Sequence, residues 1–290
     1  MSGKYALLAA LAPAVLGQTQ PPGDDYNTDA NPKLDMRTGG TILTEGFPDC
    51  TNGPLHGTKV CNTSVSSWDR AAALIAMFTL EELVNNTDST DPGVPRLGLP
   101  PVQIWNEALH GLDHYPEAMN GSFSWATSFP EPITSMASLN RSLIHQIGDI
   151  ISTQARAANN FHRYGLDSYA PNINGFRSPV WGRGQETPGE DAYFLSSLYA
   201  YEYITSMQGG VIGANDVPKI RTTPKHFAGY DIESWHNHSR LGNDVNITSQ
   251  WYASYFTPQF RTAVQFAKAK SVCSAPTNSD STGLTNIVHS

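Results

Sequence analysis

Charged and aromatic residues lie close together in three separate stretches of this sequence. The charged or titratable residues are Glu107, Arg183, Lys225 and His226, and the aromatic residues beside them are Trp105, Tyr169 and Trp181. A sugar presents hydroxyl groups that need charged or bidentate partners, and apolar ring faces that pack on aromatic side chains. This combination of residue types therefore favours a carbohydrate-binding site.

A structural role is the alternative for each of these charged residues. Arg183 could brace a loop by pairing with Glu186 or Glu190. Lys225 and His226 could lie at a solvated strand end. The residue types by themselves leave both roles open.

Several other kinds of active site are absent from the sequence. It contains no G-x-S-x-G elbow, no P-loop and no H-E-x-x-H motif. Glu107 with His110, and His236 with His238, have spacings that suit metal ligands, but each pair lacks further ligands nearby. We therefore expect neither a metal nor a cofactor.

Three longer sequence blocks follow one another along the chain. They are Pro92–Pro100 leading into Ile104–Gly111, then Tyr169–Asp191, then Thr223–Asp231. Together they resemble the fungal-type β-xylosidase branch of glycoside hydrolase family 3, and the likeness runs from about Asp49 to Ser274. The resemblance implies a xylan 1,4-β-xylosidase, with a xylo-oligosaccharide or a related β-glycoside as its substrate.

The resemblance also implies roles for individual residues. Glu107 matches the acidic residue that binds sugar hydroxyls in the −1 subsite, where a glutamate is associated with pentoses. Arg183 matches the arginine, and Lys225 and His226 the Lys-His pair, that hold the same ring. Tyr169 matches a wall of that subsite. The preference among xylose, arabinose and glucose stays open.

Catalysis in this family uses two further carboxylates. Members are retaining enzymes, in which a nucleophile and an acid/base stand about 5–5.5 Å apart. In the family the nucleophile follows a later barrel strand, in a Ser-Asp-x-Asp-like segment beyond a Cys-Ser-Tyr-Asn motif, and the acid/base lies in a second domain. Here that motif becomes Cys273-Ser-Ala-Pro276. We therefore expect no catalytic residue in this chain, and Asp280 is in the wrong context to be the nucleophile.

Residues 275–290 do not resemble the family. They are rich in Ser, Thr and Asn, and they suggest an out-of-frame or intron-derived tail, or an unusual isoform. The chain is accordingly expected to be inactive. The alternatives are a non-catalytic carbohydrate-binding pseudoenzyme and a non-functional fragment.

Strands and helices alternate along the chain. Strand patterns cover 102–105, 166–170, 219–223 and 271–274. A first helical pattern begins at Ser67–Asp69, with Asp69 as a possible N-cap, and its apolar stripe reaches Leu83. Further helical patterns cover 139–160, 190–207 and 248–269. This alternation predicts an α/β domain with a parallel sheet. Polar segments directly follow several strands, which favours a (β/α)8 TIM-barrel-type domain over an open sheet. We expect it to span 67–274 and to be incomplete at its C-terminal end.

The segment that precedes this domain has features of an exported protein. Residues 1–17 have a basic start and an apolar stretch that predict a secretory signal peptide. Residues 18–66 are expected to form an extended arm with a Cys50–Cys61 disulfide. The alternative is that these two thiols are unpaired. The third cysteine, Cys273, has no cysteine left to pair with. Six sequons are candidate glycosylation sites: Asn62, Asn85, Asn120, Asn140, Asn237 and Asn246.

The composition restricts the partners of the chain. Its 290 residues carry a formal net charge of −8, with 39% hydrophobic and 15% charged residues. An acidic chain of this kind is not expected to bind nucleic acid or an anionic membrane, and it suits a neutral, hydroxyl-rich ligand. We therefore expect a secreted, extracellular protein that binds sugars. The composition does not indicate an oligomeric state.

Overall fold

The computed structural model describes residues 48–87, 90–112, 126–160, 164–213, 216–236, 238–240 and 247–274. Several predictions fall outside these residues: the signal peptide at 1–17, the arm up to residue 47, the tail at 275–290, and the sequons at Asn120, Asn237 and Asn246.

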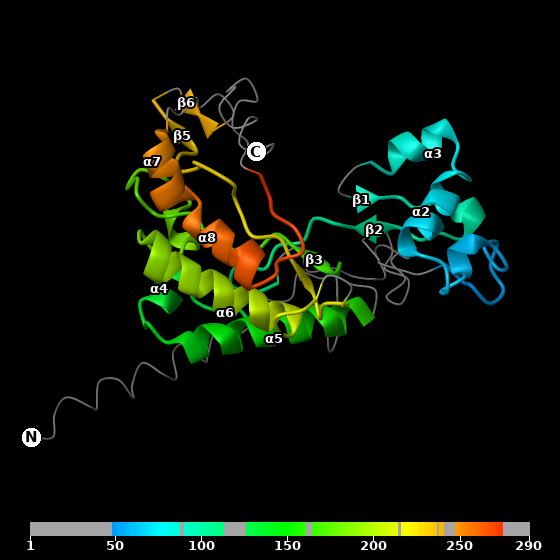
Figure 1. The fold of residues 1–290 in the computed structure, drawn as a ribbon, viewed down its shortest axis with the longest axis horizontal. Coiled ribbons are helices and arrows are strands. Elements are labelled where there is room, and N and C mark those ends of the chain that lie inside the picture. The colour runs from blue at the N-terminus through cyan, green and yellow to red at the C-terminus, as the bar shows by residue number, and fades with distance from the viewer. Residues whose placement is uncertain are drawn as a thin grey trace, which may run out of the picture.

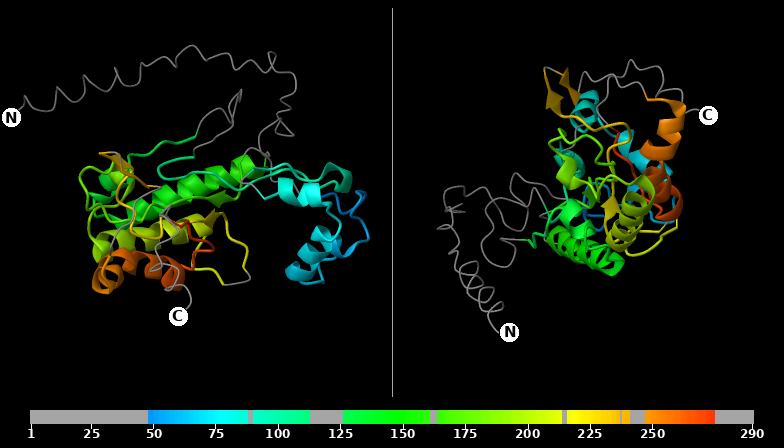
Figure 2. Two further views of the ribbon diagram at one scale, coloured as in Figure 1. Left: turned by 90° about the horizontal axis from the view of Figure 1, so that it is seen from above. Right: turned by 90° about the vertical axis from the view of Figure 1, so that its left-hand side faces the viewer.

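The first part of the described chain forms a small N-terminal lobe. It contains a 3-10 turn at Lys59–Cys61, α2 (Ser67–Ile75), α3 (Leu80–Asn85), a second 3-10 turn at Pro95–Leu97, and β1 (Thr90–Asp91) paired antiparallel with β2 (Val102–Gln103). Its own small core consists of Leu55, Val60, Val94 and Leu97. The lobe lies to one side of the long helices (Figures 1 and 2).

A disulfide joins Cys50 to Cys61 in this lobe, with the two Cα atoms 5.4 Å apart. The predicted pairing is confirmed, and the alternative of two unpaired thiols is wrong.

The helical stripe that starts at Ser67 is divided between α2 and α3. Ser66, and not Asp69, is the N-cap of α2, because its hydroxyl accepts a hydrogen bond from the Asp69 N–H at 3.1 Å. A second helix starts after Thr79, which forms a capping box with Glu82. Thr79 Oγ1 accepts from the Glu82 N–H and the Glu82 carboxylate accepts from the Thr79 N–H, so a new helix start replaces a continuous helix.

The main body continues the alternation of helices and strands. Its elements are α4 (Pro132–Met136), α5 (Arg141–Asn160), β3 (Asp167–Ser168), a 3-10 turn (Gly184–Glu186), a π-helical turn (Ala192–Ser196), α6 (Ser197–Gln208), β4 (Arg221–Thr222), β5 (Ser234–Trp235), β6 (His238–Ser239), α7 (Ser249–Trp251), a π-helical turn (Tyr252–Phe256), α8 (Pro258–Arg261) and a π-helical turn (Thr262–Phe266). β5 and β6 form an antiparallel hairpin.

Extended segments that are far apart in sequence run parallel to one another. β3 pairs with β4, with Asp167 opposite Arg221. The pairing continues past both strands at Asn172 and Lys225, and a further parallel bridge joins Phe227 to Ser274. On the other side of β3, the Tyr169 N–H donates to the Asn106 carbonyl at 2.8 Å. The segments that follow β2, β3 and β4 and the segment at 273–274 therefore lie side by side in chain order, as expected for an α/β domain.

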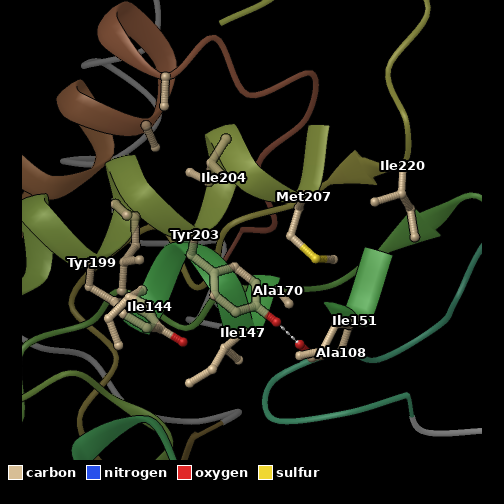
Figure 3. Close-up of a cluster of buried hydrophobic side chains, with 14 of the residues drawn as sticks. Ala108, Ile144, Ile147, Ile151, Ala170, Tyr199, Tyr203, Ile204, Met207 and Ile220 are labelled. Carbon is tan, nitrogen blue, oxygen red and sulfur yellow. Dashed lines mark hydrogen bonds between the residues drawn. The ribbon is translucent and has the colours of Figure 1, made fainter. Parts of the chain in front are cut away.

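The packing of α5 against α6 forms the main hydrophobic core (Figure 3). From α5 the buried side chains are Ile144, Ile147, Ile151, Ala155 and Ala158, and from α6 they include Tyr199, Tyr203, Ile204 and Met207. Leu143 and Ile150, which are apolar residues of the same helix, are instead 37% and 41% exposed. Tyr203 donates its hydroxyl hydrogen to the Ala108 carbonyl, which ties this core to the segment after β2.

Two helices predicted as continuous are interrupted. Asp191 caps the helix that starts at 192, where a π-helical turn precedes α6. Gly209 ends α6 with a φ of 84°, in the left-handed region that favours glycine. The predicted helix over 248–269 is broken at Thr257 because Pro258 follows it. Proline supplies no N–H and restricts the residue before it, so α8 starts as a new helix at that position.

Gly148 lets α5 approach α6, and its replacement by alanine tests this contact. An added Cβ would lie 2.0 Å from Ser206 Oγ and 3.2 Å from the Tyr203 carbonyl oxygen. We expect Gly148→Ala to lower the free energy of unfolding by about 2 kcal/mol, because overpacking outweighs the better helix propensity of alanine. Chemical denaturation measures this value.

Gly182→Ala is the matched control, because no atom lies within 4 Å of the added Cβ. Its effect should be below about 1 kcal/mol. Equal stabilities of the two variants would show that the α5–α6 contact tolerates a methyl group.

Candidate active site

A cavity of about 550 Å³ opens beside the ends of the parallel segments. Its lining includes residues from the segment after β2, from the loop before α6 and from the segment after β4: Trp105, Glu107, Leu109, His110, Gly111, Leu112, Ala126, Thr127, Ser128, Arg183, Glu186 and Lys225. Three of the predicted sugar-binding residues, Glu107, Arg183 and Lys225, therefore face one hollow.

Asn106 fixes the backbone that carries Glu107. Its side chain is fully buried, and Nδ2 donates to the Asp167 carbonyl at 2.9 Å while Oδ1 accepts from the Gly165 N–H at 3.2 Å. The Tyr164 hydroxyl donates to the carbonyl of Glu107 itself at 2.8 Å. Because buried polar groups need partners, these bonds leave the segment after β2 little freedom to move relative to β3.

Glu107 and Lys225, which both line the cavity, form an ion pair. Lys225 Nζ lies 2.5 Å from Glu107 Oε2, and the Trp105 indole N–H donates to Glu107 Oε1 at 3.1 Å. Lys225 is 2% exposed, whereas Trp105 is 47% exposed. The carboxylate thus compensates a buried ammonium group, and the indole ring remains accessible to a ligand.

Arg183 forms a bidentate ion pair with Glu186. Its Nε donates to Oε1 at 2.7 Å and its Nη2 donates to Oε2 at 2.6 Å. Burial by itself would lower the pKa of Arg183, but the hydrogen bonds and the charge of Glu186 outweigh burial and raise it. The guanidinium group also lies over the Tyr230 ring, 5.8 Å from its centroid. Arg183 therefore both braces its loop, as the structural alternative proposed, and lines the cavity.

His226 follows Lys225 in the chain and lies near Arg183. Both of these residues line the cavity, whereas His226 is not among its lining residues. It is buried, its ring meets Tyr230 edge-on with centroids 4.7 Å apart, and its Nδ1 is 3.2 Å from Asn174 Oδ1. Burial, and then the positive charges of Arg183 and Lys225, lower the pKa of His226 to about 2. The imidazole is therefore neutral at ordinary pH.

The remaining aromatic residues differ in position. Tyr169 is half-buried beside β3 and is not among the residues that line the cavity. Burial, followed by the nearby charges of Asp167, Cys273 and Glu107, raises its pKa. Trp181 is buried against Tyr230, with ring centroids 5.2 Å apart. Its role in sugar binding, like that of Tyr169, stays a prediction.

Several residues of the site were not identified from the sequence. Asn174 holds His226, and Tyr230 receives a hydrogen bond from Arg240 at 3.0 Å and donates one to Glu233. The polar Asn172-Ile173-Asn174 segment directly after a strand was the available signal for Asn174. Thr127 and Ser128 carried no signal, because the segment before them has no distinctive pattern.

Removing Glu107 and removing Lys225 are predicted to lower the free energy of unfolding by different amounts. Glu107→Gln should lower the free energy of unfolding by about 3 kcal/mol, because it leaves a buried ammonium group unpaired. Lys225→Met should cost less, since the side chain of Glu107 is 19% exposed and water can solvate it. Denaturation of both variants and of the double variant checks this. Equal costs for the two single variants would contradict it.

The neutral His226 makes a prediction about acid stability. In the folded protein its pKa is near 2, and in the unfolded chain it is near 6.5. Only the unfolded state takes up this proton between those values, so stability falls as pH drops below about 6.5. His226→Gln should make the slope of unfolding free energy against pH shallower by up to about 1.4 kcal/mol per pH unit.

Denaturation between about pH 4 and pH 7 measures these slopes. The exposed His56, changed to Gln, serves as the control for a histidine that is not buried. A parallel slope for His226→Gln would show that His226 is protonated in the folded chain.

Similarity to known proteins agrees with the geometry. A Probable exo-1,4-beta-xylosidase xlnD from Aspergillus clavatus is 62% identical over 266 residues, which is 92% of this chain and 33% of that protein. An Exo-1,4-beta-xylosidase xlnD from Aspergillus oryzae is 61% identical over 270 residues, again 92% of this chain and 33% of that protein. The chain therefore spans about a third of the length of these relatives.

A solved structure shows the same likeness in three dimensions. It is a GH3 exo-beta-xylosidase (XlnD) in complex with a xylobiose aziridine activity based probe, with a TM-score of 0.76 and 59% identity, covering 81% of this chain and 30% of that one. Residues 97–285 match the Glycosyl hydrolase family 3 N terminal domain. This match covers more than half of the chain, and the chain belongs to glycosyl hydrolase family 3.

Proposed function

We propose that this chain supplies the sugar-binding side of the active site of a retaining exo-β-xylosidase that acts on xylo-oligosaccharides or related β-glycosides. The observation that carries the proposal is the convergence of Glu107, Arg183 and Lys225 on one cavity, although Glu107 and Lys225 are 118 positions apart in sequence. The similarity to exo-β-xylosidases supports the choice of substrate.

The charges in the cavity suit a neutral ligand. Glu107 is paired with Lys225, and Arg183 is paired with Glu186, so neither pair requires a charged substrate. The ammonium and guanidinium groups have further N–H donors available for sugar hydroxyls. The accessible ring of Trp105 offers an apolar surface beside them.

The two lining carboxylates are suited to binding rather than to bond cleavage. Retaining hydrolysis needs one carboxylate that attacks the anomeric carbon and another that protonates the leaving oxygen. Glu107 and Glu186 are each held by a cation within 2.6 Å. The proposal therefore assigns both catalytic groups to residues outside those that the structure describes. A non-catalytic sugar-binding protein is the second candidate, favoured by the same ion-paired carboxylates.

The proposal includes a (β/α)8 barrel, predicted over residues 67–274, of which this chain contributes the part that follows the N-terminal lobe. Parallel segments in sequential order support a barrel, because an open doubly wound sheet reverses its order. The outer helices agree with this arrangement: α5 packs against α6, and α6 packs against α8, in chain order (Figure 1).

We also propose that the protein is secreted and glycosylated. The Cys50–Cys61 disulfide is typical of an oxidising compartment. The described sequon asparagines Asn62, Asn85 and Asn140 are all exposed, as glycan acceptors must be. In the part of the chain that the structure describes, no helix has the length and apolar character needed to cross a bilayer.

Isothermal titration of the 290-residue chain with xylobiose tests the binding function. We expect saturable binding, and Arg183→Lys should weaken it about tenfold because the planar bidentate donor is lost. Arg96→Lys is a matched control, since Arg96 forms the same bidentate pair with Glu82 in the N-terminal lobe, away from the cavity. Absence of xylobiose binding, or equal weakening by both variants, would overturn the proposal.

Incubation of the same chain with p-nitrophenyl β-xyloside tests the assignment of catalysis. We expect no release of nitrophenol above the buffer rate, because both catalytic carboxylates are assigned elsewhere. Turnover that disappears in Glu107→Gln would place a catalytic group within the chain and would contradict that assignment.

A further inference from the structure

Asn174 holds His226 through three contacts. Its Nδ2 donates to the His226 carbonyl at 2.8 Å, and its Oδ1 accepts from the His226 backbone N–H at 2.8 Å. The same Oδ1 lies 3.2 Å from Nδ1 of the imidazole ring. Both side chains are buried, so these bonds do not compete with bulk water.

These contacts determine which nitrogen of His226 carries the proton. The backbone of His226 offers a donor and an acceptor, so the Asn174 amide fits in one orientation, with oxygen toward N–H and nitrogen toward C=O. That orientation places an oxygen, which can only accept, against Nδ1. A neutral imidazole has one N–H, so Nδ1 must be the protonated nitrogen and Nε2 carries the lone pair.

The surroundings keep the ring neutral. Arg183, Lys225 and Arg240 place positive charges near it, Tyr230 packs against it, and burial opposes its protonation. Nε2 has no hydrogen-bond partner among the described residues. Some described polar atoms are buried from solvent and lack a partner, but Nε2 is not one of them. It is therefore neither paired nor sealed from solvent.

We propose that Asn174 is a positioning residue that fixes His226 as its Nδ1–H tautomer, so that Nε2 accepts a hydrogen bond from a sugar hydroxyl. This inference rests on the proposed sugar-binding function of the cavity. It adds a neutral acceptor near Lys225 and Arg183, which can only donate, and near Glu107, each of whose oxygens already accepts one hydrogen bond. A ligand must then offer a hydroxyl hydrogen at this position.

Nitrogen NMR of the 290-residue chain labelled with ¹⁵N-histidine tests the tautomer without any sugar. The His226 signals are identified by their loss in His226→Gln. We expect a protonated, pyrrole-type Nδ1 and an unprotonated, pyridine-type Nε2, neither of which titrates between about pH 5 and pH 8. A protonated Nε2, or titration in this range, would overturn the inference.

Asn174→Asp tests the positioning role through the pKa of His226, which the replacement of a merely structural residue would not change. A carboxylate facing Nδ1 favours the imidazolium form, so the pKa of His226 should rise into the measurable range. Xylobiose binding in this variant should weaken about tenfold as pH falls through that pKa, because Nε2–H can no longer accept. Binding to the unsubstituted chain should not follow this titration.

Asn159→Asp is the matched control, because Asn159 is also a buried asparagine, on α5, that donates to a backbone carbonyl, that of Tyr164. It should leave the His226 signals unchanged. Unaltered His226 signals in Asn174→Asp would remove Asn174 from this role.

The two proposals fail differently. A correct tautomer without xylobiose binding would refute the sugar-binding function and leave the positioning of His226 by Asn174 standing. Xylobiose binding with a protonated Nε2 would refute the tautomer alone.

Discussion

The ammonium group of Lys225 lies inside the protein and requires a nearby negative charge. Glu107 provides this charge at 2.5 Å, from a segment 118 positions earlier in the chain. A buried charge without a partner is strongly unfavourable, so the end of the segment after β2 and the end of the segment after β4 must meet. The cavity lies at that meeting point, and its polar end depends on this pair.

The same principle extends outward from the pair. Arg183 is compensated by Glu186 in a bidentate pair, and Glu186 also accepts a hydrogen bond from Asn172 at 3.4 Å. Asn172 in turn accepts from the Asn174 N–H at 3.1 Å, and Asn174 holds His226. Polar groups that are half-buried or buried thus form a connected set, in which each member restricts the next. Such a set holds its donors and acceptors ready for a neutral ligand.

Hydrophobic packing supports this polar network from behind. α5 and α6 meet closely because Gly148 leaves room for Ser206, and Tyr203 reaches from α6 to the Ala108 carbonyl. Ala108 follows Glu107 directly, so the position of the carboxylate depends on the helix pair. Asn106, on the other side of Glu107, is tied to the β3 segment. The backbone of the site is therefore fixed on both sides of its central acid.

The sequence by itself determined the alternation of helices and parallel extended segments in the main body and indicated the family, and it predicted the Cys50–Cys61 pairing, because these depend on local patterns and on motifs that can be read in order. It did not determine helix continuity: the capping box at Thr79 and the proline at 258 outweigh the apolar periodicity that predicted longer helices. Nor did it decide which charged residue pairs with which. Glu186 and Glu190 were equal candidates for Arg183, and only the turn at 184–186 brings Glu186 into bidentate contact. The roles of Asn174 and Tyr230 appeared only in the folded chain, because they depend on contacts with residues about 50 positions away, and such long-range contacts leave no periodic pattern in the sequence.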